Sequence, residues 1–356
     1  MAIKLPTEAG EEILPVGKLP PHLLQRLLAQ SERLGADPSR DPAVLLGPGI
    51  GLDCAVIDLG ERCLVLKSDP ITFASQEIGW YALQVNANDL ACMGAAPRWL
   101  LLTCLLPEGK TTAQDVEHLA DKLYRACAEM GVTVVGGHTE ITHGLERPLL
   151  VGALIGDVAK KRLVTPRGAR PGDRLLLTKG VPIEATALLA GEFPSRLRDV
   201  LSPKELEQAR RYLYEPGISV LKDARLALAA GIVHAMHDPT EGGLYTAAWE
   251  LAEASGCSAW VEREAVPVPE LGGRICRALG LDPLAAIASG ALLLAAPSND
   301  ARLIQQALTA GGILCVEIGT LSGGLPEAWI RLPGADYQPM PRPARDAVAV
   351  LFDADA

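Results

Sequence analysis

Carboxylates near positions 53 and 69 could together hold a metal ion. Asp53 directly precedes a strand-like run (54–59), and Asp69 ends a second run (62–69), with a Gly-Glu pair between the runs. This pattern predicts a β-hairpin in which the two aspartates lie side by side. Converging carboxylates repel each other unless an oxygen-seeking cation binds, and Mg²⁺ is the natural candidate. A separate turn or capping role for each aspartate is the alternative.

A third carboxylate, Asp89, interrupts the apolar side of a helix predicted over residues 76–93, which Ser75 opens. The apolar stripe of this helix runs through Ile78, Ala82, Val85, Asp89, Cys92 and Met93, with Asn88 beside it. Burying an ionised carboxylate without a partner is costly, so a positive group should compensate Asp89. The alternative is that Asn88 and Asp89 cap a neighbouring backbone segment.

Two glycine pairs could bind an anion. In VVGGHTE (134–140), a strand that ends in Gly136-Gly137 would let backbone N–H groups approach a phosphate, and Thr139 and Glu140 could hold a metal ion or a ribose. A plain turn is the alternative there. For His138, which borders this turn, the alternative is a hydrogen-bonded structural group.

The second pair, Gly242-Gly243 in HDPTEGGL (237–244), follows a strand and opens a helix, whose N-terminus favours phosphate. Asp238 is a further metal or substrate candidate in the same turn. Lys179, at the end of another strand-like run, could meet a phosphate or face solvent, and the sequence does not separate these.

The composition limits the classes of protein. The chain has 356 residues, 49% of them hydrophobic, and a net charge of −10, which argues against a nucleic acid or an anionic membrane as partner. No apolar run reaches 18 residues. The eight cysteines occur singly, without a CxxC pair, which favours a reducing cytoplasm.

The segments that position these residues predict a two-domain α/β (α+β) chain. We expect a leader with one helix (1–45), an N-terminal domain (46–160), a C-terminal domain (161–335) and a tail (336–356). The basic, turn-rich stretch 157–173 marks the boundary, because the alternation of strands and helices restarts after it.

Seven motifs, in this order and spacing, resemble the aminoimidazole ribonucleotide synthetase (PurM-like) superfamily, and the resemblance covers about residues 40–325. The motifs are GPGIGLDCAVI, KSDPITF, QEIGWYALQVNANDLACMGAAP, VVGGHTEIT, TPRGARPGDRLLLTKGVPIEATALLA, HDPTEGGL and IASGALLLAAP. Within the superfamily the chain looks most similar to the HypE family of hydrogenase maturation proteins.

The resemblance implies a PurM/HypE-like fold that forms a homodimer through its N-terminal sheets and binds ATP and Mg²⁺ between its domains. It implies an ATP-dependent enzyme that phosphorylates a carbonyl or amide oxygen of a small substrate. The implied metal ligands are Asp53, Asp69, Asp89 and Asp238, and the implied catalytic residues are Asp89, His138 and Asp238. The implied nucleotide-binding residues are Asn88, Gly136, Gly137, Thr139, Glu140, Lys179, Gly242 and Gly243.

Three departures from the family pattern modify these expectations. Leu52 precedes Asp53 where the family has paired aspartates, and His138 stands where an aspartate is usual, so Glu140 is expected to take its place. HypE ends in a cysteine that is carbamoylated and then dehydrated to a thiocyanate, whereas this sequence ends AVAVLFDADA. We therefore expect HypE-like chemistry on a small substrate. The alternatives are a small-molecule kinase or cyclo-ligase, and a catalytically reduced nucleotide-binding protein of hydrogenase maturation or regulation.

Overall fold

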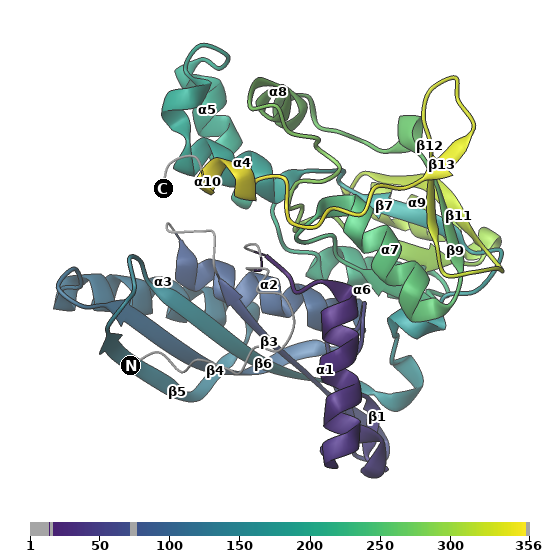
Figure 1. Cartoon of the computed structure of the whole chain (residues 1–356), viewed down its shortest axis with the longest axis horizontal. Coiled ribbons are helices and arrows are strands. Elements are labelled where there is room, and N and C mark those ends of the chain that lie inside the picture. Colours follow the sequence, from purple (N-terminus) through teal and green to yellow (C-terminus); the bar gives the residue numbers. More distant parts are fainter. Residues whose placement is uncertain (1–13, 15–16, 72–76, 354–356) are drawn as a thin grey trace.

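The computed structural model describes residue 14 and residues 17–71 and 77–353. Each half of the chain forms a mixed α/β layer built on one sheet, and the two halves pack against each other (Figure 1). Helix α1 (Pro21–Leu34) lies near β1 in Figure 1, and residues at its start line a cavity together with residues of both halves. No helix in the described ranges is long and apolar enough to cross a membrane.

The first sheet has the strand order β1-β2-β3-β6-β4-β5. Its strands are β1 (Val44–Leu46), β2 (Ala55–Asp58), β3 (Arg62–Ile71), β4 (Ala96–Pro107), β5 (Thr133–Thr142) and β6 (Leu149–Ala159). Strands β2 and β3 pair antiparallel, with Ala55 opposite Leu66, so the predicted hairpin is confirmed. Helices α2 (Ile78–Cys92) and α3 (Ala113–Met130) cover one face of the sheet (Figure 1).

The second sheet has the order β13-β12-β9-β11-β7-β10-β8. Its strands are β7 (Arg174–Thr178), β8 (Ala235–His237), β9 (Ser258–Glu262), β10 (Leu293–Ala296), β11 (Cys315–Ser322), β12 (Ala328–Arg331) and β13 (Tyr337–Pro339). The helices of this half are α4 (Ile183–Glu192), α5 (Pro203–Arg210), α6 (Leu221–Ala230), α7 (Gly243–Ser255), α8 (Glu270–Ala278), α9 (Ser298–Ala310) and α10 (Ala349–Asp353).

Helices cover both faces of the second sheet, as the contacts of β7 show. Successive residues of a strand point to opposite faces of its sheet, so neighbouring leucines of β7 contact different helices. Leu175 and Leu177 join the apolar cluster that contains α7 residues, and Leu176 joins the cluster of α6 and α9. A strand buried on both faces reads as a continuous apolar run, as RLLLT does.

Helix α2 is buried on nearly every side: the predicted stripe from Ile78 to Met93 is buried, and so is the opposite side of the helix. Within the helix only Trp80 is not fully buried, and Gln84, Asn86 and Asn88 are buried together with the apolar residues. The sheet covers one side of α2, and α6 and β8 of the second half cover the other. Ser75, which we expected to open this helix, lies outside the described residues.

Strand β5 does not end at Gly136-Gly137 but continues to Thr142. A Cβ at Gly137 would lie 1.9 Å from the backbone oxygen of Leu102 in the parallel neighbour β4. The close approach that requires glycine is therefore to β4, in the middle of a strand.

Candidate functional site

Three of the predicted aspartates converge on a lysine that we did not predict. The ammonium Nζ of Lys67 lies 3.0 Å from an Oδ of Asp89, 3.5 Å from one of Asp69 and 3.8 Å from one of Asp53. We call these four residues the acid–lysine cluster. It joins the end of the β2–β3 hairpin to the C-terminal half of α2.

The alternation of β3 places Lys67 inside. Cys63 and Val65 are fully buried and Ile71 is nearly so, and Lys67 and Asp69 lie on the same face of the strand, toward α2. Helix α2 supplies Asp89 from above this face. The positive group that the buried Asp89 required is thus a side chain of the neighbouring strand.

Lys67 and Asp53 stabilise each other's charged forms, whereas burial outweighs Lys67 at Asp69 and Asp89 and raises the pKa of both carboxyl groups. Burial opposes the ammonium form of Lys67, but Asp89, Asp53 and Asp69 outweigh burial and hold its pKa well above the ordinary value. Burial also opposes ionisation of Asp53, yet Lys67, His237 and Lys18 lower its pKa below the usual range. For Asp89 burial dominates and raises its pKa.

A chain of ion pairs extends from the cluster into the second half. Nδ1 of His237 lies 3.3 Å from Asp53, and its Nε2 lies 2.8 Å from Glu250, which in turn lies 3.1 Å from Nζ of Lys18. Burial opposes the charged form of His237, but the hydrogen bond to Glu250 and the charge of Asp53 outweigh it and raise the pKa of the imidazole. Asp53 is therefore shared between Lys67 and His237.

Asp238, predicted as a metal or substrate ligand, is buried next to this chain. One of its Oδ atoms accepts a weak hydrogen bond from the Cys92 thiol at 3.6 Å, and the other has no partner among the described residues. Burial raises the pKa of Asp238.

A cavity of about 620 Å³ opens above the cluster, with Asp53 and Lys67 in its wall. Four further segments complete the lining: α1 with the residues before it, the glycine loop 49–52, the start of α7, and the C-terminal segment 342–346. Its volume is in the range typical of small-molecule sites.

The glycine pair at the start of α7 is engaged within the chain. The N–H of Gly242 donates to an Oδ of Asp346 at 2.7 Å, and a Cβ at Gly243 would lie 2.4 Å from the backbone oxygen of Leu284. A carboxylate of the C-terminal segment thus takes the position of the anion that we predicted at this helix N-terminus. Burial raises the pKa of Asp346 to about 6.

Models of two protein-family domains match the chain. Residues 51–158 match the N-terminal domain of AIR synthase related proteins, and residues 170–327 match the C-terminal domain of the same proteins. A carbamoyl dehydratase HypE of Azotobacter vinelandii is 30% identical over 271 residues, 72% of this chain and 74% of the relative. The chain belongs to the AIR synthase related family.

Further relatives of this AIR synthase related protein carry hydrogenase maturation names. A putative hydrogenase expression/formation protein of Methanocaldococcus jannaschii is 28% identical over 266 residues, 71% of this chain and 75% of the relative. Among solved structures, HypE in complex with ATP matches with a TM-score of 0.61 and 24% identity, over 88% of this chain and 94% of that one. A ThiL protein complexed with AMPPCP and TMP matches with a TM-score of 0.67 and 21% identity, over 91% and 98%. The HypE–HypF complex matches with a TM-score of 0.64 and 20% identity, over 81% of this chain and 93% of that one. The expected PurM/HypE-like fold is confirmed.

The segment 136–140 lies apart from the acid–lysine cluster within one chain. Asp69 pairs with Gly152, which pairs with Leu102, which pairs with Gly137, so β5 is three strand spacings from β3, or roughly 14 Å. The segment is exposed, Thr139 included, and His138 Nε2 lies 3.0 Å from Glu140. A single chain does not bring these residues to the cluster.

Asn88 links the two halves of the chain. Its amide nitrogen donates to the backbone oxygen of Ile218 at 2.8 Å, and its amide oxygen accepts from the N–H of Val220 at 2.9 Å. The side chain lies next to Asp89 in sequence but points to the second half. The capping alternative from the sequence analysis describes this contact.

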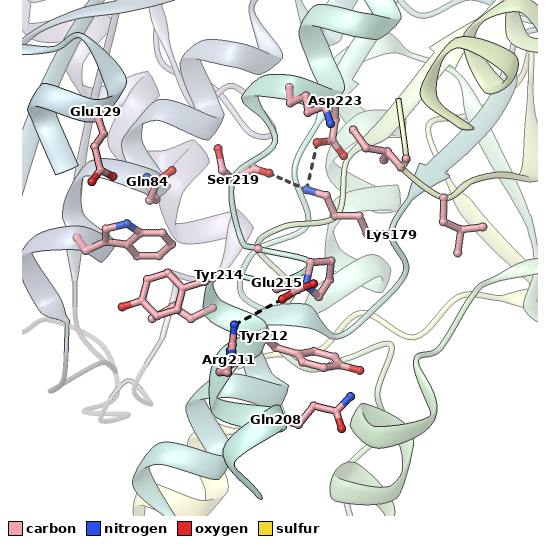
Figure 2. Close-up of a pocket in the computed structure, with 18 of the residues that line it drawn as sticks. Gln84, Glu129, Lys179, Gln208, Arg211, Tyr212, Tyr214, Glu215, Ser219 and Asp223 are labelled. Atoms are coloured by element: carbon pink, nitrogen blue, oxygen red, sulfur yellow. Dashed lines mark hydrogen bonds and ion pairs between the residues drawn. The ribbon is translucent and has the colours of Figure 1, made fainter. Parts of the chain in front are cut away.

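Lys179 lies in a second cavity, of about 1280 Å³, between the two halves. Figure 2 shows its ammonium between Ser219 and Asp223, with 2.6 Å to the backbone oxygen of Ser219 and 3.1 Å to an Oδ of Asp223. Trp80 and Tyr214 also line this cavity, with ring centroids 5.1 Å apart. Burial lowers the pKa of Lys179 although Asp223 opposes this shift. Lys179 is therefore a buried, paired lysine and does not face solvent.

The acid–lysine cluster, as arranged, does not fit a divalent metal ion. An ammonium already lies among its carboxylates, and no group of three or more His, Cys, Asp or Glu side chains in the described ranges is placed to hold a metal. The buried orphan oxygen of Asp238 is a single donor. We therefore assign no metal to these residues.

Three residues of the site were missed by the sequence reasoning: Lys67, Glu250 and Asp346. The period-two pattern Cys63-Val65-Lys67 contained the signal for Lys67, because it places a lysine on a buried face. Glu250 and Asp346 carried no such signal, since their positions depend on how the two halves dock.

Proposed function

We propose that this protein binds ATP in the 620 Å³ cavity and uses it to activate a carbonyl or amide oxygen of a small substrate by phosphorylation. The observation that carries the proposal is the position of Lys67: the residue lines the cavity beside Asp53, with its ammonium 3.8 Å from that carboxylate, and in this proposal it meets a polyphosphate. Relatives with carbamoyl dehydratase and kinase names, and neighbours solved with ATP or AMPPCP, support the same reaction class.

In this proposal the chain supplies position and charge. Lys67 donates to a phosphate oxygen and offsets the negative charge, and Asp53, Asp69 and Asp89 hold the ammonium in place. The substrate oxygen attacks the terminal phosphorus, the bond from phosphorus to the bridging oxygen breaks, and ADP leaves with that electron pair. Magnesium, if bound to the nucleotide, would supply positive charge to its phosphates, and the carboxylates of the cluster would not be its ligands.

Calorimetric titration with a non-hydrolysable ATP analogue, in the presence of magnesium, tests this function. We expect wild type to bind and Lys67→Met to bind roughly 10- to 100-fold more weakly, the loss of one charged hydrogen bond. Lys110→Met, an exposed lysine outside the cavity, is the matched control. ADP release with a panel of small carboxamides and carbonyl compounds then identifies the substrate. Absence of analogue binding in wild type would refute the function.

We also propose a homodimer formed through β5. This strand is the edge of the first sheet, and Val135 and Ile141 on it are 51% and 54% exposed. Unpaired strand edges with apolar side chains favour pairing with another chain. A partner β5 would bring a second copy of the segment 136–140 close to the first. A dimer mass in analytical ultracentrifugation that Val135→Lys converts to a monomer mass tests this.

A maturation partner protein is a further proposal, which the solved HypE–HypF complex supports. A reaction on a cysteine of this chain has less support. All eight cysteines of the printed sequence are buried and free, and burial raises the pKa of Cys315 to about 12. The cytoplasmic location that we predicted agrees with unpaired thiols.

A second candidate is a nucleotide-binding protein with reduced turnover. The hydrogen bond between Gly242 and Asp346 favours it, because a carboxylate occupies the helix terminus where a phosphate was expected. Binding of the analogue without ADP release for any compound in the panel would support this candidate.

A further inference from the structure

Lys67 lies at a nearly buried strand position, where a lysine is unusual. Its side chain is only 10% exposed, on a strand face that otherwise carries core residues such as Val65 and Ile71. An unpaired ammonium at such a position would be strongly unfavourable. It is tolerated here because three carboxylates, from β3, α2 and the segment before β2, surround it.

The same three carboxylates are the group that a divalent cation would need. Mg²⁺ binds carboxylate oxygens at about 2.0–2.1 Å and requires near-octahedral space around it. Nζ of Lys67 takes that space, at 3.0–3.8 Å from Asp89, Asp69 and Asp53. A dication placed there would also meet the fixed positive charge of the ammonium.

The other charged and titratable groups near the cluster point to the same conclusion. Asp53 is also paired with His237, so it cannot turn toward a metal without breaking a contact. Asp238 receives the thiol of Cys92 on one oxygen, and its other oxygen, which has no partner among the described residues, is a single donor. Cys54, the remaining titratable neighbour, is buried, and burial raises its pKa well above the usual value. The three carboxylates of the acid–lysine cluster are thus already paired with side chains of this chain.

We infer that Lys67 is the resident cation of this site: its ammonium replaces a divalent metal ion among Asp53, Asp69 and Asp89. A consequence, which rests on the proposed function, is that the site binds a nucleotide polyphosphate through the lysine. The cluster then needs no metal of its own to hold the nucleotide.

A titration of the full chain with Mn²⁺ alone tests the inference, and it requires neither nucleotide nor turnover. Electron paramagnetic resonance measures the bound Mn²⁺. We expect that replacing Asp89 by Asn leaves Mn²⁺ binding of the otherwise wild-type protein unchanged, because the cluster holds no metal. Lys67→Met leaves Asp69 and Asp89 without their ion-pair partner and Asp53 with His237 alone, and it is expected to gain a Mn²⁺ site at least tenfold tighter than any in wild type. Lys67→Arg keeps the charge and is expected to gain none. Lys110→Met is the matched control and is expected to behave as wild type.

A wild-type Mn²⁺ site that Asp89→Asn abolishes would overturn the inference, even if Lys67→Met fails to fold. Folded Lys67→Met that gains no site would overturn it as well. A second experiment measures binding of the ATP analogue to wild type in the presence of EDTA, which removes divalent metal ions. Binding that persists supports Lys67 as the partner of the phosphates, and loss of binding contradicts this role of Lys67. Absence of analogue binding under every condition refutes the proposed function alone, because the Mn²⁺ arm still decides the role of Lys67.

Discussion

The buried carboxyl group of Glu184 makes a quantitative prediction for stability against pH. Glu184 lies in α4, is 5% exposed, and one of its Oε atoms has no hydrogen-bond partner among the described residues. Burial raises its pKa from 4.5 to about 8, although contact with Ser289 opposes the shift. The group is therefore protonated in the folded protein at neutral pH and ionised in the unfolded chain.

The sign and size of the effect follow from this difference. Because the folded state binds the proton more tightly, the stabilisation is complete below pH 4.5 and is lost as the pH rises to about 8. A shift of about 3.5 pKa units corresponds to roughly 5 kcal/mol in total, or about 1.4 kcal/mol per pH unit within the window. Glu184→Gln removes the titration and keeps the shape of the side chain. The free energy of unfolding of this variant, relative to wild type, should therefore rise by about 1.4 kcal/mol for each pH unit between pH 4.5 and pH 8.

Urea unfolding at half-unit steps from pH 5 to pH 8 measures the difference. Titrating groups that do not interact with Glu184 are present in both proteins and cancel, whereas the charge of Asp346 helps to raise the pKa of Glu184, so its titration is part of the measured difference. The matched control is Glu207→Gln, whose side chain is 65% exposed in α5. If the curves of wild type and Glu184→Gln run parallel across this window, the reasoning about the buried carboxyl group is refuted.

Three further predictions concern packing and the helix terminus. Asn88→Ala leaves two buried backbone groups without partners and should cost roughly 1–3 kcal/mol for each in urea unfolding, whereas the exposed Asn299→Ala should cost little. Gly137→Ala places a Cβ 1.9 Å from a backbone oxygen and should lower the melting temperature; Gly191→Ala in α4, where a Cβ meets nothing within 4 Å, should not. Asp346→Ala frees the helix N-terminus of α7, and titration with pyrophosphate should show at least tenfold tighter binding; unchanged affinity would count against the capping role.

The sequence predicted the local structure well where the signal was local. The hairpin that carries Asp53 and Asp69 followed from two apolar runs and the Gly-Glu pair between them. Such signals depend on neighbours within one strand or one helical turn. They do not depend on how the halves of the chain dock.

Features that depend on packing between segments could not be predicted in the same way. The period of α2 suggested one apolar face, but the second half of the chain covers the other face and buries it too. The pair Gly136-Gly137 suggested an anion loop, whereas the glycines allow two parallel strands to approach. In both cases the residue type was informative, but the partner lay more than 30 residues away or in another half.

The polar residues of α2 show why a helix can be buried on all sides and still be specific. Asn86 donates to the backbone oxygen of Ala82 within the helix, Asn88 binds the backbone before α6, and Asp89 pairs with Lys67 on β3. Apolar packing alone tolerates small rotations of a helix, because hydrophobic contacts have no direction. A buried amide or carboxylate that loses its partner is costly, so Asn88 fixes the rotation of α2 against the second half and Asp89 fixes it against the first sheet. Asp89 thus has two roles that cannot be separated: it compensates Lys67 in the site, and it fixes how α2 sits on the sheet that carries Lys67.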